Sequence, residues 1–154
     1  MIFRLKYPSE KQIEIWNFNR EKKSGREIAL LKSVTPGFVS KTLKEANERI
    51  KDLIINTAKS NKITINESDI NEKKGFAKGY SPIFNTPVKI TFSPVNGIQL
   101  WYEHKGECAL CSEFDNCRRT IIQEFKDRNI KIENESLEPT ELSEILLNEI
   151  EKRE

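Results

Sequence analysis

The chain has 154 residues, enough for one compact domain or for two small modules that share a core. Hydrophobic residues make up 36% of it and charged residues 32%. No apolar run approaches the roughly 20 residues that a bilayer span requires. The first residues also lack the apolar core and small-residue cleavage site of a secretory signal. These features exclude a membrane-spanning class, and the sequence predicts a cytoplasmic protein.

The net charge of +2 conceals an unequal distribution of charge along the chain. Residues 1–92 contain 18 lysines and arginines against 10 acidic residues, whereas residues 93–154 contain 8 against 14. A basic half joined to an acidic half is expected when one part meets a polyanion and the other meets protein or solvent. General enrichment of surface Lys and Glu, as in thermophilic proteins, would give a similar pattern and stays an alternative.

The first sixty residues have the periodicity of three helices, over 10–20, 24–33 and 35 to about 57. Apolar residues recur in the third at spacings of three and four, which gives it one long apolar face. The second and third predicted helices both begin with capping signals. A hydroxyl residue precedes each helix, and in the third a proline follows at the first helical position, where proline is tolerated. The residues that give these signals are Ser24, Glu27, Thr35 and Pro36.

Beyond residue 60 the period changes to two. The runs 62–66, 88–92 and 98–102 alternate and are enriched in β-branched or aromatic residues. Asn96-Gly97 between the last two runs indicates a hairpin, because both residues tolerate positive φ. We therefore expect a three-stranded antiparallel sheet in which residues 71–87 form a loop. After it, a helix over 118–128, a polar linker over 133–138 and an amphipathic helix over 139–152 complete an α+β fold.

The second and third predicted helices meet the requirements of a helix-turn-helix. Ala29 is the small residue where two such helices cross, Ser33–Thr35 is the tight turn, and Val39 is the apolar residue within the second helix. The segment 27–46 resembles the helix-turn-helix of sigma-factor region 4 and of archaeal Tfx-type transcription regulators. The pattern usually has Gly at the position of Ser33 and Leu at that of Lys32. The resemblance covers roughly residues 10–60 and implies sequence-specific binding of double-stranded DNA.

In that motif the first turns of the second helix read base edges, and residues around the first helix contact the DNA backbone. The expected base-reading residues are Pro36, Gly37, Ser40, Lys41 and Lys44. The expected backbone contacts are Arg20, Lys22, Lys23 and Arg26, with Lys73, Lys74 and Lys78 as a weaker addition from a loop. A merely solvated basic face is the alternative for each of these residues.

Four soft or borderline metal ligands follow the predicted sheet, His104, Cys108, Cys111 and Cys117. A Cys-x2-Cys pair with one more Cys and one His is an established set for structural zinc. The Cys-x2-Cys-x5-Cys spacing also resembles part of the iron-sulfur loop of endonuclease III-type glycosylases, whose fourth cysteine is absent here. Zinc is therefore expected first, an iron-sulfur cluster second, and metal-free thiols with an unligated His104 third. The metal would staple the helical C-terminal part.

An enzyme is not expected, because four protein ligands leave a metal no open position for water. The sequence also lacks a phosphate-binding glycine loop, a nucleophile elbow and a histidine-based triad. Two other functions stay open. Phe92, Trp101 and Tyr102 would stack bases of RNA or of single-stranded DNA if they were exposed on the sheet. An acidic metal-bearing half would dock a protein, such as a component of the transcription machinery.

The predicted organisation is a DNA-binding domain over 1–60, a sheet with its metal module over 61–132, and a linker with a tail helix over 133–154. A homodimer is expected, since two half-sites give the contact area that specific DNA binding needs. Two apolar seams are candidates for the dimer contact unless both fold back on their own subunit. They are Leu142, Ile145, Leu146 and Ile150 in the tail, and Ile50, Leu53 and Ile54 in the third helix.

Overall fold

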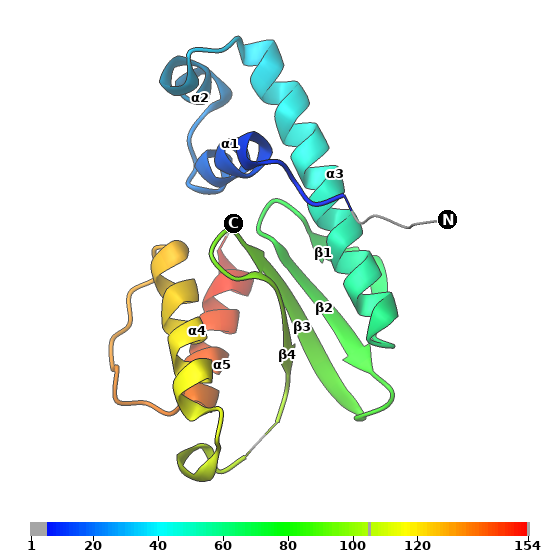
Figure 1. Ribbon diagram of the computed structural model, residues 1–154, viewed down its shortest axis with the longest axis vertical. Coiled ribbons are helices and arrows are strands. Elements are labelled where there is room, and N and C mark those ends of the chain that lie inside the picture. The colour runs from blue at the N-terminus through cyan, green and yellow to red at the C-terminus, as the bar shows by residue number, and fades with distance from the viewer. Residues whose placement is uncertain (1–5, 105, 154) are drawn as a thin grey trace.

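The computed structural model describes residues 6–104 and 106–153, which form an α+β fold (Figure 1). The elements in chain order are α1 (Glu10–Arg20), α2 (Gly25–Lys32), α3 (Pro36–Ser60), β1 (Thr64–Asn71), β2 (Phe76–Ser81), β3 (Thr86–Ser93), β4 (Gly97–Tyr102), the 3-10 turn η1 (Cys108–Leu110), α4 (Phe114–Asp127) and α5 (Pro139–Lys152). Within these residues no helix has the length and apolar character that crossing a membrane requires.

The elements form three layers with a helical extension (Figure 1). The second half of α3 covers one face of the sheet, while α4 and α5 cover the other. The first half of α3 projects beyond the sheet, and α1 and α2 pack against it. This long helix therefore connects the N-terminal helices directly to the sheet.

The three N-terminal helices are present where the sequence predicts them, because their caps are specific. The hydroxyls of Ser9 and Ser24 each accept a hydrogen bond from the backbone N–H three residues later. The side chains of Gln12 and Glu27 in turn accept from the backbone N–H groups of these serines, which completes two capping boxes. The Thr35 hydroxyl accepts from the N–H of Phe38 at 3.1 Å, and Pro36 occupies the first helical position of α3. The predicted helix over 139–152 is also confirmed.

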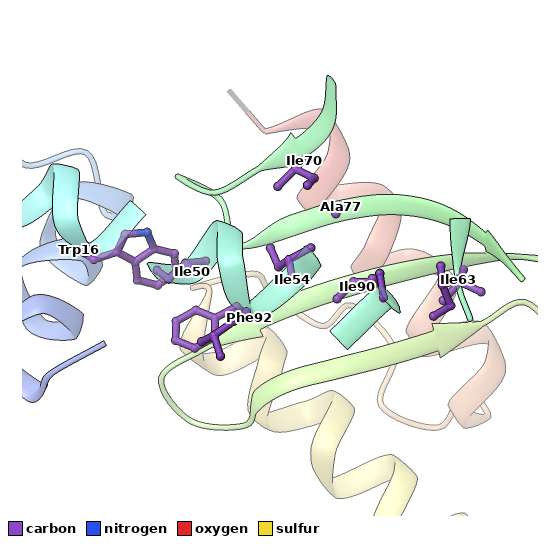
Figure 2. Packing of buried hydrophobic residues seen from close by; sticks show 12 residues of the cluster. Trp16, Ile50, Ile54, Ile63, Ile70, Ala77, Ile90 and Phe92 are labelled. Carbon is purple, nitrogen blue, oxygen red and sulfur yellow. The ribbon is translucent and has the colours of Figure 1, made fainter. Parts of the chain in front are cut away.

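The main core lies between α3 and the sheet (Figure 2). Ile50 and Ile54 of α3 are fully buried and pack against Ile90 and Phe92 of β3. The ring of Trp16 in α1 packs edge to face with that of Phe92, with 5.4 Å between the ring centroids. Because Trp16 reaches this core, α1 is packed on the sheet as well as on α3.

The opposite face of the sheet carries a separate apolar cluster. Phe76 and Trp101 from the strands meet Ile121 and Phe125 of α4, together with the buried face of α5. The expectation of a metal-stapled helical C-terminal part was wrong, since no group of three or more His, Cys, Asp or Glu side chains able to hold a metal occurs among the described residues. Apolar burial holds α4 and α5 on the sheet instead.

The sheet has four strands in the order β1-β2-β3-β4, all antiparallel, so the predicted three-stranded sheet was also wrong. The additional strand, β2, lies in the segment that was expected to be a loop. Gly79 explains why the pattern was missed. A Cβ on Gly79 would lie 2.8 Å from Cγ2 of Ile63 and 2.9 Å from the carbonyl oxygen of Thr64, so this strand needs a glycine where the neighbouring chain passes closely.

The apolar cores extend across the predicted domain boundaries. Ala46 to Ala58 of α3 are part of the same cluster as the strands, although the boundary was placed at residue 60. Leu142, Leu146 and Ile150 of α5 pack with α4 on the other side of residue 132. The two seams proposed for a dimer are thus largely used within the chain, with only Ile145 of the tail seam exposed, at 43%.

The close approach at Gly79 gives a first test. We expect Gly79→Ala to lower the free energy of unfolding by about 1–3 kcal/mol, because the added methyl group must displace packed atoms of β1. Gly25→Ala is the matched control, since a Cβ there meets nothing within 4 Å. Urea unfolding of the two variants measures the difference. Equal stability of both would show that β1 and β2 are not paired in this register.

Candidate nucleic-acid interface

The connection between α2 and α3 is a three-residue turn. Ser33 ends α2 in the left-handed conformation, with φ of 53°, and its N–H donates to the carbonyl oxygens of Ala29 and Leu30. The N–H of Val34 also donates to the carbonyl oxygen of Ala29 at 3.0 Å, which completes the C-terminal cap of α2. Serine therefore adopts the conformation for which glycine is the usual residue.

A small core fixes the angle between these helices. Ile15 of α1, Ile28 and Ala29 of α2 and Val39 of α3 form one buried cluster. Ala29 and Val39 are the two residues that the sequence placed at the helix crossing. Because the apolar side of α3 is buried here, its polar side faces outward over the first two turns.

The five predicted base-reading residues all lie on that outward side. Pro36, Gly37, Ser40, Lys41 and Lys44 are exposed, while Val39 and Thr42 are buried. Residues 33–44 contain two lysines and no acidic residue. The free N–H groups at the start of a helix add a partial positive charge to the same surface.

The four predicted backbone contacts divide into two groups. Lys22 and Arg26 are exposed and have no side-chain partner in the described part of the chain, and Lys23 lies 3.3 Å from Glu21. Arg20 is different, because its guanidinium pairs with Asp127 of α4 at 2.7 Å and its side chain is only 10% exposed. That guanidinium also lies over the ring of Trp16, so Arg20 joins α1 to the rest of the fold.

The β1–β2 turn lies beside α3, which the sequence did not reveal. Its Lys73 and Glu72 form a groove of about 580 Å³ together with Asn19 of α1 and one side of α3. The residues of α3 in this groove are Ser40, Leu43, Lys44, Asn47, Glu48 and Lys51. The groove therefore adjoins two predicted base-reading residues, Ser40 and Lys44.

The other two lysines of the predicted loop contact α5 instead. Lys74 donates to the backbone carbonyl of Glu151 at 3.1 Å, and Lys78 pairs with its carboxylate at 2.7 Å. The hydrogen bond from Lys78 lowers the pKa of Glu151, and the same bond raises the pKa of Lys78. Of the three loop lysines, Lys73 is thus the one beside the helix-turn-helix.

The three aromatic side chains predicted for base stacking do not form an open platform. Phe92 is fully buried in the core against α3. Trp101 packs on the cluster with α4 and α5, and its indole N–H donates to the Thr91 hydroxyl at 2.8 Å. Tyr102 is half-buried, and its ring meets that of Phe84 edge to face. Base stacking on these three side chains is therefore not what the geometry favours.

The cysteine segment crosses η1 and the start of α4. Cys108 is buried, with its sulfur 3.5 Å from the Thr140 hydroxyl, whereas Cys111 and Cys117 are exposed. Burial raises the pKa of the Cys117 thiol, and the neighbouring Cys108 and Cys111 raise it further. The fourth predicted ligand, His104, is exposed with its ring beside Gly106. The expectation of zinc, or of an iron-sulfur cluster, stays a prediction for this segment.

Comparisons with protein-family models, with curated protein sequences and with solved structures found no match to this chain.

Chelation tests the role of any bound metal. Because an apolar cluster holds α4 and α5 on the sheet, we expect EDTA to shift the midpoint of thermal unfolding by less than about 2 °C, which for a chain of this length is under about 1 kcal/mol. Elemental analysis of protein purified without oxygen reports zinc or iron directly, and Cys111→Ser serves as a ligand-depleted reference. A shift of many degrees in a zinc-containing sample would contradict this prediction and show that the metal stabilises the fold.

Proposed function

We propose that this chain is a transcription regulator that binds double-stranded DNA through the first turns of α3. The observation that carries the proposal is the exposed, acid-free start of that helix, held at a fixed angle by the buried cluster of Ile15, Ile28, Ala29 and Val39. An α-helix fits the major groove of B-form DNA and reads it with the residues of its first turns. Ser40, Lys41 and Lys44 have suitable donors for guanine acceptors or phosphates.

The surroundings of α3 support the same assignment. Lys22 and Arg26 flank the start of α2 with two exposed positive charges that suit a phosphate, beside the Glu27 carboxylate of the capping box. Lys73 extends the positive surface on the side of the groove. Arg20 is left out of this interface, because its ion pair with Asp127 occupies it within the fold. DNA contact would thus involve α2, α3 and the β1–β2 turn.

The salt dependence of duplex binding tests the proposal. We expect Lys41→Gln/Lys44→Gln to weaken binding to a labelled duplex and to reduce the slope of log K against log[salt] by roughly 2, because each lost phosphate contact removes about 0.9. Fluorescence anisotropy over a salt series measures both quantities. Lys59→Gln/Lys62→Gln is the matched control, since these exposed lysines lie at the opposite end of α3.

Two results would contradict the proposal. Equal duplex affinity of the Lys41/Lys44 variant and the control would remove the start of α3 from the interface. Tighter binding of single-stranded RNA than of duplex at the same salt concentration would favour the single-strand alternative.

We also propose that the chain forms a homodimer, but through a surface other than the two seams that the sequence suggested. The most exposed large apolar side chain on the helix-turn-helix is Leu30, at 83%, and Leu31 beside it is 58% exposed. Neighbouring exposed leucines make α2 the candidate for a protein contact on this part of the chain. We propose that α2 supplies the homodimer contact, because the seams on α3 and α5 are engaged in the cores.

Light scattering decides this point. We expect a dimer that Leu30→Gln/Leu31→Gln converts to a monomer, since the substitution removes the apolar contact. Ile83→Gln/Phe84→Gln is the matched control, because these residues are 64% and 68% exposed at the β2–β3 turn. A monomeric unmodified chain would contradict the prediction, and so would a dimer that only the control disrupts.

A further inference from the structure

We propose that a second cleft, next to the groove beside α3, binds a small molecule that carries two or more phosphoryl or carboxylate groups. The cleft lies where the α1–α2 turn, the β1–β2 turn and the C-terminal ends of α4 and α5 meet. It holds about 670 Å³, within the range of about 300–1,000 Å³ that small-molecule sites occupy. None of the residues that line it belongs to α2 or α3, but Lys22 and Lys73 are shared with the proposed contacts to the DNA backbone, so the cleft adjoins the DNA-reading surface.

The charge of this cleft is strongly positive. Its two acidic residues are already neutralised, since Asp127 pairs with Arg20 and Glu21 pairs with Lys23. Four further cations that line it have no carboxylate partner in the described part of the chain, Lys22, Lys73, Lys74 and Arg153. Like charges that converge on a partly enclosed space repel one another, and a ligand with several negative charges relieves that repulsion.

Two of these cations are held in place by backbone carbonyl groups. Arg153 donates to the carbonyl oxygen of Arg128 at 3.0 Å and to that of Asn129 at 3.4 Å. Lys74 donates to the carbonyl oxygen of Glu151 at 3.1 Å. A guanidinium has five N–H groups and an ammonium has three, so both retain donors for a ligand. The site is therefore partly organised before a ligand arrives.

A buried donor on the wall also lacks an acceptor. The Nη1 atom of Arg20 is buried and has no hydrogen-bond partner among the described residues, although the Nη2 atom of the same group binds Asp127. An unsatisfied buried guanidinium N–H is unfavourable, and buried polar groups of this kind are usually completed by water or by a bound ion. Arg20 lines the cleft, but because its Nη1 atom is buried, the side chain must shift before an anionic oxygen there can accept from it.

The remaining lining side chains indicate a compact, polar ligand. Asn19, Asn71 and Asn129 provide amide groups, whereas Ile130 and Ile150 provide a small apolar area. Among the described residues that line the cleft none is aromatic, so only arginine side chains could stack on a planar ring there. These features fit an oligophosphate or a polycarboxylate better than an aromatic ligand.

Calorimetric titration of the full chain with inorganic triphosphate, at constant ionic strength, tests this site. We expect saturable binding that Lys22→Gln/Lys73→Gln weakens by roughly 10-fold or more, since one charge-assisted hydrogen bond accounts for about that factor. Lys59→Gln/Lys62→Gln is the matched control and should stay within about 2-fold by the same criterion. Lys62 and Lys22 both have left-handed φ, at 57° and 69°, so the backbone demands of the two pairs are alike. Citrate in place of triphosphate distinguishes carboxylate from phosphoryl recognition.

Three outcomes would overturn the proposal. The first is the absence of saturable binding for both anions. The second is equal weakening in both variant pairs, which would reflect net charge alone. The third is loss of duplex binding in Lys22→Gln/Lys73→Gln while the unmodified chain ignores both anions, which would assign the cleft to the DNA backbone. Failure of the Lys41/Lys44 test would leave anion binding unaffected, so the two proposals fail separately.

Discussion

The buried ion pair of Arg128 and Glu124 holds together segments that are far apart in the sequence. Glu124 is fully buried on α4, and the Nε atom of Arg128 donates to its carboxylate at 3.0 Å. The same guanidinium donates to the carbonyl oxygens of Lys74 at 2.8 Å and Phe92 at 2.9 Å. Burial lowers the pKa of Arg128 and the charge of Glu124 opposes that shift. Loss of one partner would leave the other charge buried alone, which typically costs about 3–5 kcal/mol.

This network also determines where the N-terminal helices lie. The β1–β2 turn, which Arg128 anchors through Lys74, accepts a hydrogen bond at Glu72 from the indole N–H of Trp16, at 3.0 Å. One residue before Arg128, Asp127 pairs with Arg20 at the end of α1. Two polar contacts therefore tie α1 to segments that the Arg128–Glu124 pair has already fixed. The exposed start of α3 is held at a set position relative to the sheet, which suits a surface that must match a rigid duplex.

The helix predicted over 118–128 begins earlier, at Phe114, where no side chain caps α4. Local signals in the sequence were sufficient for the other helices and for one hairpin, because caps and turns depend on residues within a few positions of one another. They failed where the reason lies in a distant segment. Gly79 looks like a strand breaker until Ile63 is placed beside it, and Arg20 looks like a free cation until Asp127 is known to be its partner. The basic cleft was missed for the same reason, since its walls come from four separate parts of the chain.

The unequal distribution of charge along the sequence takes a more specific form once the chain is folded. Lys78 and Lys89 belong to the basic half, but both approach the carboxylate of Glu151 from the acidic half, at 2.7 and 3.6 Å. These ion pairs neutralise part of the positive charge of the basic half where it lies on the sheet. Cations without a carboxylate partner in the described part of the chain include those at the start of α3 and four of those in the cleft beside the α1–α2 turn. Asn19 and Lys73 line both the groove beside α3 and the cleft, so the two basic surfaces adjoin at the β1–β2 turn.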